Sequence, residues 1–226
     1  MCGRYTFTAK PDPALVIQSQ QQQLDLSPRY NIAPTQMALI SPMHDPEHMH
    51  FYRWGLIPHW AKDAKIGYKM INARSETILE KASFKGPMKN QRCLVWGDGF
   101  YEWKKDLGGK QPYYIGLKEH GLFAMAGLTS TWTAPNGEEL RTFTIITTEP
   151  NELMEDIHDR MPVILPPAQR EQWMDIAKDP KDLLEILRPL PAEYMSAYPV
   201  GNSVGNVRND HAQLIEPYTP PPTLFG

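Results

Sequence analysis

The stretch Arg92-Cys93-Leu94-Val95-Trp96 begins the part of the chain that decides the fold, and a strand-like pattern continues from it to Thr147. The runs that follow are rich in β-branched and aromatic residues, and turn-forming residues such as Pro135-Asn136-Gly137 separate them. Short strands at this spacing predict a curved antiparallel sheet or an open barrel. The predicted strands are Arg92–Trp96, Phe100–Lys105, Pro112–Leu117, Phe123–Thr129 and Leu140–Thr147.

The flanking segments predict more strands, with helices at the periphery. A chain of 226 residues suffices for one substantial core, and 22 prolines argue against a helical bundle. We therefore expect an α+β protein, in which residues 2–216 form one domain around a curved, barrel-like, mainly antiparallel sheet. The proline-rich tail, residues 217–226, is expected to be disordered. The other predicted elements are strands at Arg4–Phe7, Met37–Ser41, Met49–Trp54 and Met195–Pro199, helices at 11–23, Asn151–Ile157, Pro167–Ala177 and Pro180–Leu187, an extended loop from Pro28 to Pro34, and Ser75 as a helix N-cap.

Composition and cysteine count exclude several classes of protein. The two cysteines cannot form a disulfide framework, and Cys93 lies in an apolar run typical of a core. The sequence has no signal peptide and no long apolar span, which predicts a cytoplasmic protein without membrane contact. We find no metal-ligand spacing and no phosphate-binding loop, so neither a metal nor a cofactor is expected.

Basic and aromatic residues are concentrated in residues 53–92. This region holds nine Lys and Arg residues and three acidic residues, a local charge of +6 in a chain whose net charge is −3. Such a patch can follow a phosphate backbone, and tryptophans on an irregular basic segment can stack on bases. The alternatives are a solvated charged face and hydrophobic plugs under a loop.

The N-terminus can carry an unusually reactive group. Once Met1 is removed, Cys2 presents an α-amine next to its thiol. Both groups titrate near neutral pH, at about 7.7–8.0 and about 8.5 in reference compounds, so modest tuning makes either one nucleophilic. Such a 1,2-aminothiol condenses with an aldehyde to a Schiff base, which the thiol closes to a five-membered thiazolidine. The alternative for Cys2 alone is a small buried thiol near a chain end.

Two further side chains are suited to proton transfer. Strand alternation places Glu102 on the face opposite Tyr101 and Trp103, where it could point into a cavity and act as a general acid or base. The strand pattern by itself favours an exposed glutamate. His158 follows the predicted helix Asn151–Ile157, and the helix dipole would favour the charged form of its imidazole.

Seven ordered segments together closely resemble the SOS response-associated peptidase (SRAP) family, whose members process abasic sites in DNA. The resemblance spans about residues 2–216. The segments are Met1-Cys2-Gly3-Arg4, Tyr30-Asn31-Ile32-Ala33-Pro34, Trp54-Gly55-Leu56-Ile57-Pro58, Ile71-Asn72-Ala73-Arg74-Ser75-Glu76-Thr77, Gly99-Phe100-Tyr101-Glu102-Trp103, Ile157-His158-Asp159-Arg160-Met161-Pro162 and Gly205-Asn206-Val207.

This resemblance implies an activity and four catalytic residues. The implied substrate is an abasic site in single-stranded DNA, whose ring-opened sugar exposes an aldehyde. Cys2 matches the family's N-terminal nucleophile, and Asn72 matches the residue that contacts the lesion. Glu102 matches the acid/base, and His158 matches the residue that promotes opening of the sugar. The family is a lyase-type DNA–protein crosslinking enzyme that protects the lesion, can reverse its crosslink, and removes its own Met1 as an autopeptidase.

The resemblance also implies a DNA-binding channel. Arg4, Arg74 and Lys85 would contact phosphates, while Trp60 and Phe84 would stack on bases or wedge between them. The implied partner is single-stranded DNA that contains abasic sites, bound by a monomer in the cytoplasm, associated with the nucleoid, during DNA repair in the SOS response. The sequence does not identify partners at a replication fork.

Two functions of other classes stay open. Class II glutamine amidotransferases also begin Met-Cys-Gly and use an N-terminal cysteine, but they normally carry an apolar residue where this chain has Arg4. Ammonia release from glutamine would distinguish them. A non-catalytic single-strand-binding protein could use residues 53–92, but it leaves Cys2, Glu102 and His158 unexplained. Covalent attachment that survives a denaturing gel would exclude it.

Overall fold

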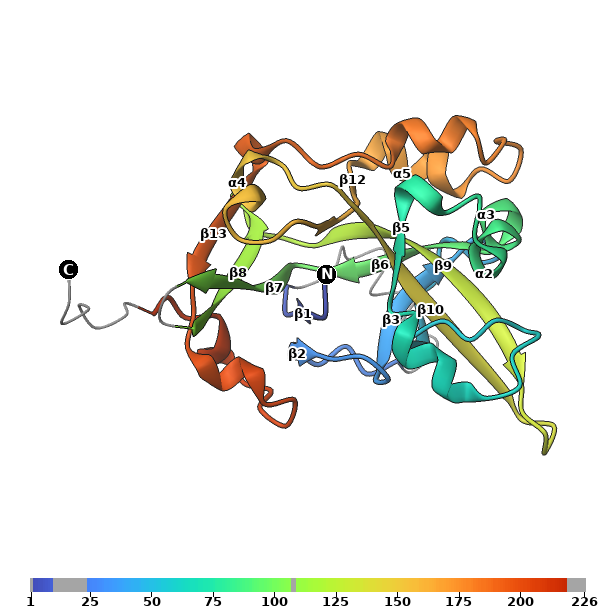
Figure 1. Ribbon diagram of the computed structural model, residues 1–226, viewed down its shortest axis with the longest axis horizontal. Coiled ribbons are helices and arrows are strands. Elements are labelled where there is room, and N and C mark those ends of the chain that lie inside the picture. The colour runs from blue at the N-terminus through green and yellow to red at the C-terminus, as the bar shows by residue number, and fades with distance from the viewer. Residues whose placement is uncertain (1, 10–23, 107–108, 219–226) are drawn as a thin grey trace.

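A closed β-barrel forms the centre of the molecule in a computed structural model that describes residues 2–9, 24–106 and 109–218 (Figure 1). Its strands are β3 (Met37–Pro42), β4 (His50–Trp54), β6 (Arg92–Gly97), β9 (Phe123–Thr133) and β10 (Glu139–Thr148). They pair in the order β10-β4-β3-β6-β9, and β9 pairs with β10 to close the ring. The barrel is mixed, because β4 runs parallel to β10 while the other pairs are antiparallel.

Short strands extend the barrel at β10 and β9. They are β5 (Asn72–Arg74), β11 (Met161–Pro162) and β12 (Ile164–Leu165). β5 pairs in parallel with β10, starting with Asn72 opposite Ile145, whereas the end of β4 places Trp54 opposite Phe143. β4 and β5 therefore lie one after the other along the same edge of β10, and residues 55–71 leave the barrel between them.

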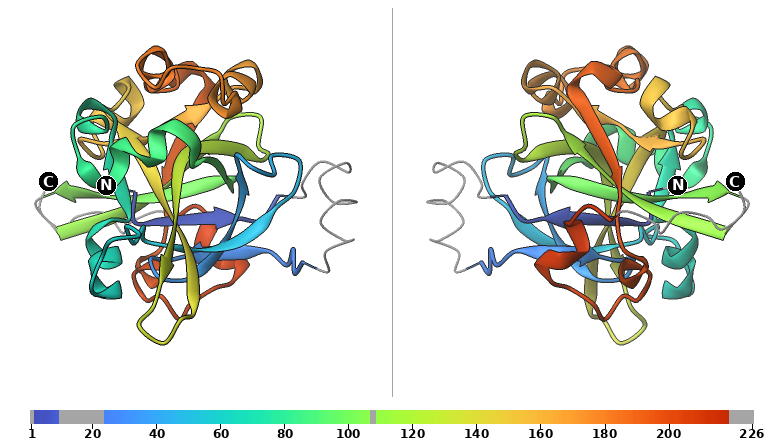
Figure 2. Two further views of the ribbon diagram at one scale, coloured as in Figure 1. Left: turned by 90° about the vertical axis from the view of Figure 1, so that its right-hand side faces the viewer. Right: turned by 90° about the vertical axis from the view of Figure 1, so that its left-hand side faces the viewer.

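A second, antiparallel sheet carries the N-terminal strand. Its strands are β1 (Arg4–Phe7), β2 (Arg29–Ile32), β7 (Gly99–Asp106), β8 (Gly109–Leu117) and β13 (Met195–Pro199), paired in the order β13-β8-β7-β1-β2. β6 of the barrel leads directly into β7, and the intervening Asp98 carboxylate accepts hydrogen bonds from the hydroxyls of Thr6 and Thr8. These bonds fix β1 beside the barrel, and Figure 2 shows β1 near the centre of the molecule.

Short helices lie outside the sheets (Figures 1 and 2). None of the helices in the described residues is long and apolar enough to span a membrane. The α-helices are α2 (Ala82–Lys85), α3 (Pro87–Asn90), α4 (Glu152–Glu155) and α5 (Pro167–Met174), and the 3₁₀ helices are η1 (Ala64–Lys69), η2 (Ser75–Thr77), η3 (Asp182–Ile186), η4 (Ala192–Tyr194), η5 (Asn202–Gly205) and η6 (Ala212–Ile215).

The core also contains a buried cation that fastens helices to the barrel. Arg92, at the start of β6, is fully buried, and its guanidinium donates to the backbone oxygens of Met88, Trp173 and Asp175, each at 2.6 Å. Because a buried charge is tolerated only when it is well hydrogen-bonded, these carbonyl groups hold α3 and the end of α5 in place. Arg92 is therefore unavailable to a ligand, although it contributes to the positive charge of residues 53–92.

The sequence predicted the fold class and most strands correctly. The structure confirms an α+β fold with a barrel, and every predicted strand is present within a few residues. The predicted loop from Pro28 to Pro34 is partly wrong, because it contains β2, which pairs with β1. The prediction for Ser75 is also wrong: Ser75 is the first residue of η2, and Arg74 occupies the cap without a side-chain hydrogen bond.

The helix predictions were less accurate in their bounds. The first predicted helix, residues 11–23, lies almost entirely outside the described residues, as do residues 219–226 of the tail. The helix predicted at Pro180–Leu187 is the 3₁₀ helix η3, and α5 ends at Met174. At the start of the predicted tail, the Tyr218 N–H donates to the Pro199 oxygen at 2.8 Å, which attaches the chain to β13.

Candidate active site

Cys2 lies directly before β1 and is fully buried. Because β1 is antiparallel to β7 and places Arg4 opposite Tyr101, the chain before Arg4 runs towards Glu102 and the later part of β7. The Asn72 side-chain amide donates from Nδ2 to the Cys2 carbonyl oxygen at 2.9 Å, and the Cys2 thiol lies 3.9 Å from the Arg4 oxygen. The second sheet and the edge of the barrel thus hold the backbone of Cys2 between them.

Asn72 is the first residue of β5, and its side chain has a second polar atom at the site. Pairing with β10 fixes the Asn72 backbone opposite Ile145. Oδ1 of Asn72 is buried and has no hydrogen-bond partner among the described residues. A buried acceptor without a partner costs free energy, so this oxygen is well placed to accept a hydrogen bond from a bound hydroxyl group.

Glu102, in the middle of β7, is only 3% exposed. The interpretation of Glu102 as an exposed residue was therefore wrong: alternation gives the face of a strand, but it does not reveal which face other segments cover. Burial raises the pKa of Glu102 from its usual 4.5 to about 7, since the ionised form loses hydration. Both the acid and the carboxylate are thus populated near neutral pH, as a residue that gives and takes protons requires.

His158 lies beside this carboxyl group, with Nε2 3.8 Å from Oε2 of Glu102. Nδ1 accepts a hydrogen bond from the Arg160 backbone N–H at 3.0 Å, which leaves Nε2 to carry the proton of a neutral ring. The exposed Asp159 carboxylate also lies 2.9 Å from Nδ1 and opposes this arrangement, yet burial has the larger effect and lowers the pKa of His158. The predicted stabilisation of the charged form by a helix is wrong, because α4 ends at Glu155.

The Cys2 thiol is protonated in this environment. Burial raises the pKa of Cys2, and the negative charge of Glu102 raises it further. A protonated thiol is a weak nucleophile, so the thiol must lose its proton as it attacks. Glu102 is the titratable group best placed to receive that proton.

An ion pair that the sequence did not reveal connects the two halves of the site. Arg160 donates to both carboxylate oxygens of Glu76, at 2.6 and 3.0 Å, and to the Thr147 backbone oxygen at 2.5 Å. It therefore ties the segment that carries His158 to the segment that follows Asn72. Both partners lie in segments quoted above, but residues 84 positions apart give no local signal of their pairing.

Arg4, predicted to contact phosphate, has several partners within the protein. Its Nη1 donates to Asn31 Oδ1 at 2.9 Å and to the Val204 oxygen at 2.8 Å, and Nη2 donates to the Gly205 oxygen at 3.2 Å. These bonds hold the 201–207 loop against β1 and β2. A role for Arg4 in DNA binding stays a prediction, in which its remaining N–H groups would face the phosphate.

The other four predicted DNA contacts differ in exposure. Arg74 and Lys85 are exposed, at the ends of β5 and α2, and Trp60 is 52% exposed. Phe84 is 8% exposed and packs in the hydrophobic core, where it presents little surface to a base. Stacking by Phe84 stays a prediction that would require a movement of α2.

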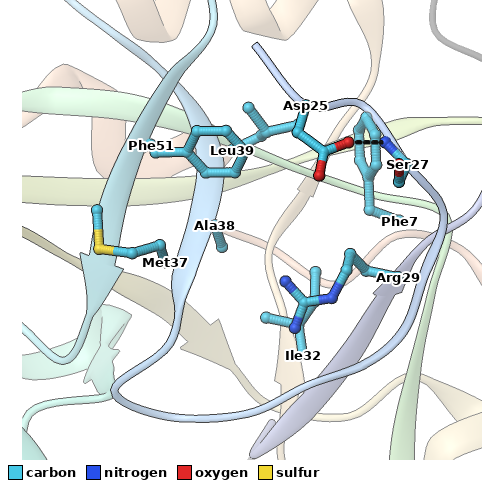
Figure 3. A pocket seen from close by; sticks show the side chains of 9 residues that line it. All are labelled: Phe7, Asp25, Ser27, Arg29, Ile32, Met37, Ala38, Leu39 and Phe51. Carbon is cyan, nitrogen blue, oxygen red and sulfur yellow. Dashed lines mark hydrogen bonds between the residues drawn. The ribbon is translucent and has the colours of Figure 1, made fainter. Parts of the chain in front are cut away.

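Two depressions were compared with this cluster. A pocket of about 330 Å³ opens beside His158, and Trp103, Lys105, Glu155, Asp156, Ile157 and Asp159 complete its lining. A smaller pocket of about 50 Å³, shown in Figure 3, lies between β1–β4 and the segment before β2 and includes none of the four candidate catalytic residues. In the described part of the chain, no group of three or more His, Cys, Asp or Glu residues is arranged to hold a metal ion.

Comparison with known proteins identifies the family. The sequence model of the SOS response associated peptidase (SRAP) family matches residues 1–207. The chain belongs to the SRAP family. Among SRAP relatives, the abasic site processing protein YoqW of Bacillus subtilis is 47% identical over 223 residues, which cover 96% of this chain and 99% of YoqW. YoaM of the same organism, also named an abasic site processing protein, is 45% identical over 224 residues, covering 96% of this chain and 98% of YoaM.

A solved structure shows the same SRAP fold. A crystal structure of a protein from Bacteroides thetaiotaomicron superposes with a TM-score of 0.85 at 29% sequence identity, covering 96% of this chain and all of that one. The barrel with its attached antiparallel sheet is therefore the architecture of this family.

Proposed function

We propose that this protein processes abasic sites in single-stranded DNA by attaching Cys2 covalently to the opened sugar. Relatives named abasic site processing proteins support the substrate class. The observation that carries the proposal is the arrangement around Cys2: Asn72 holds its carbonyl group at 2.9 Å, and a carboxyl group with a pKa of about 7 lies 3.8 Å from a histidine beside it.

The chemistry begins with hydrolysis of the Met1–Cys2 peptide bond, which consumes one water and releases methionine. Before this step the Cys2 nitrogen is an amide nitrogen, delocalised into the carbonyl group and unable to attack an aldehyde. The freed amine adds to C1′ of the ring-opened sugar and loses one water to form an imine. The thiol then adds to the imine carbon, and its proton passes to the nitrogen, which gives a thiazolidine. Reversal follows the same steps backwards and releases the DNA.

Each neighbouring residue has a role in these steps. Glu102 moves protons during imine formation, during ring closure and during reversal, because both of its protonation states are accessible near pH 7. Oδ1 of Asn72 accepts a hydrogen bond from a hydroxyl group of the sugar. His158, neutral and exposed enough to reach the substrate, promotes opening of the cyclic sugar.

DNA reaches the site across the basic part of the surface. Arg74 and Lys85 pair with phosphates, and Trp60 stacks on a base near the lesion. Single-stranded DNA is the preferred form, because the catalytic groups must surround an extrahelical sugar, and unstacking a base in a duplex costs a few kcal/mol. Salt should weaken this binding before the covalent step.

Intact-mass analysis tests the proposal. The protein is incubated with a single-stranded oligonucleotide that contains one abasic site, without reductant. The expected product has the mass of the protein without Met1 plus the oligonucleotide minus one water, and it survives a denaturing gel.

Cys93→Ser is the matched control, since Cys93 is the other buried thiol, and it should still form the adduct, whereas Cys2→Ala should not. An adduct from Cys2→Ala would mean that another residue, such as a lysine, is the nucleophile. Absence of any adduct from the wild type, together with ammonia release from glutamine, would favour an amidotransferase.

A further inference from the structure

The excursion between β4 and β5 carries an aromatic side chain that the proposed function does not yet use. Tyr68, in η1, is 61% exposed, more than any other large hydrophobic or aromatic residue in the described residues except Ile176. The Arg53 guanidinium lies over its ring, 5.9 Å from the ring centroid. This distance is within the range of a cation–π interaction, which orients an exposed ring at little cost.

The excursion is closed at its base, so Tyr68 does not lie on a loose loop. The Leu56 N–H donates to the Met70 oxygen at 3.0 Å, and the Trp54 indole donates to the Ile71 oxygen at 2.8 Å. Gly55 and Gly67 approach each other so closely that a Cβ built on Gly67 would lie 2.8 Å from the Gly55 oxygen. η1 is therefore packed directly on the chain that leaves β4.

This position places the excursion next to the candidate active site. β4 and β5 follow one another along β10, with Trp54 opposite Phe143 and Asn72 opposite Ile145. Tyr68 precedes Asn72 by four residues. A DNA strand that presents a sugar to Asn72 thus passes close to η1 with its neighbouring nucleotides.

The charges around Tyr68 indicate which ligand the surface fits. Lys62 and Lys69 are exposed, Lys65 lies on η1 between them, and Asp63 is occupied as the cap of η1, where it accepts from the Lys65 N–H at 2.8 Å. Exposed aromatic rings among cations are the features that bind single-stranded nucleic acid, in which bases stack and phosphates pair with lysine. A protein partner would call for a wider apolar surface, which this segment lacks.

We propose that Tyr68, oriented by Arg53, is a second base-stacking platform, which with Trp60 binds two nucleotides on one side of the lesion. This inference rests on the proposed function, and it adds a contact that sets how tightly the strand is held before any bond forms. Loss of Tyr68 therefore lowers non-covalent affinity and leaves the chemistry at Cys2 intact.

Fluorescence anisotropy with a lesion-free single-stranded oligodeoxynucleotide tests the proposal in the full-length protein. Tyr68→Ala should weaken binding about tenfold, whereas Tyr68→Phe keeps the ring and should bind like the wild type. The dependence of affinity on salt should be unchanged in Tyr68→Ala, because no charge is removed. Tyr194→Ala is the matched control: Tyr194 is 56% exposed but lies beside Glu119 and Glu193, so its loss should have no effect.

A second measurement separates this inference from the proposed function. At saturating abasic DNA, Tyr68→Ala should form the adduct at the wild-type rate. Unchanged lesion-free binding by Tyr68→Ala, or equal weakening by Tyr194→Ala, would overturn the platform while leaving the crosslink standing. Weaker binding by Tyr68→Ala in a protein that forms no adduct would uphold the platform and overturn the crosslink.

Discussion

Replacing Glu102 with glutamine should make the protein more stable at high pH while slowing its chemistry. Burial raises the pKa of this carboxyl group from 4.5 to about 7 in the folded state. At about 1.4 kcal/mol per pKa unit, ionisation of Glu102 then costs the folded protein about 3 kcal/mol relative to the unfolded chain. Below pH 4.5 the group is protonated in both states and costs nothing.

The sign of the pH dependence follows from proton binding. Between pH 4.5 and 7 the folded state binds the proton more tightly, so stability falls as the pH rises through this window. Glutamine cannot ionise, and Glu102→Gln should therefore melt at a similar temperature to the wild type at pH 4.5. At pH 8 it should melt about 6–12 °C higher, since 1 kcal/mol shifts the melting temperature of a chain of this size by about 2–4 °C.

Thermal unfolding followed by circular dichroism at several pH values measures this difference. Glu138→Gln, at an exposed position in the turn between β9 and β10, is the control and should follow the wild type throughout. Formation and reversal of the adduct should both be slower in Glu102→Gln, because one acid/base serves both directions. Parallel melting curves for Glu102→Gln and the wild type from pH 4.5 to 8 would refute a raised pKa and, with it, the assignment of Glu102 as the proton carrier.

Three more outcomes are expected. Cys2→Ser should form a shorter-lived adduct, since a hydroxyl closes a less stable ring, and equal half-lives on heating would contradict closure by the thiol. His158→Ala should slow the reaction with a cyclic abasic site but not with an analogue that has a free aldehyde; a rate on that analogue as low as on the abasic site would contradict the role in sugar opening. Gly67→Ala should destabilise the protein by about 1–3 kcal/mol in denaturant unfolding, because its Cβ meets the Gly55 oxygen, and should weaken DNA binding; wild-type stability would mean that the two segments separate easily.

The sequence predicted strands well because their signal is local. The runs from Arg92 to Thr147 show β-branched and aromatic residues with turns between them, and these patterns survive folding. β2 was missed because Pro28 and Pro34 flank it, and only its pairing with β1 makes Arg29–Ile32 a strand. The parallel pairing of β4 with β10, which closes the barrel, joins segments about 90 residues apart and leaves no trace in either one.

The candidate site was predicted through the family resemblance, whereas its electrostatics required the structure. Residue types alone could not show that Glu102 is buried or that His158 loses charge, because both effects depend on segments distant in the chain that cover these side chains. The partners of Arg4 and Arg160 belong to the same class of long-range contact. Tyr68 carries no motif, and only its exposure next to Arg53 marks it.

The interrupted strand along β10 also has a consequence for how this protein can vary. The excursion leaves the barrel opposite Phe143 and rejoins it opposite Ile145, so its two ends are fixed close together by β10. The barrel therefore does not dictate how many residues lie between these ends, and doubling a loop costs only about 0.6 kcal/mol. The excursion acts as an exchangeable cassette: substituting a segment of different length and composition would retune which strands are captured while the reactive centre stays as it is.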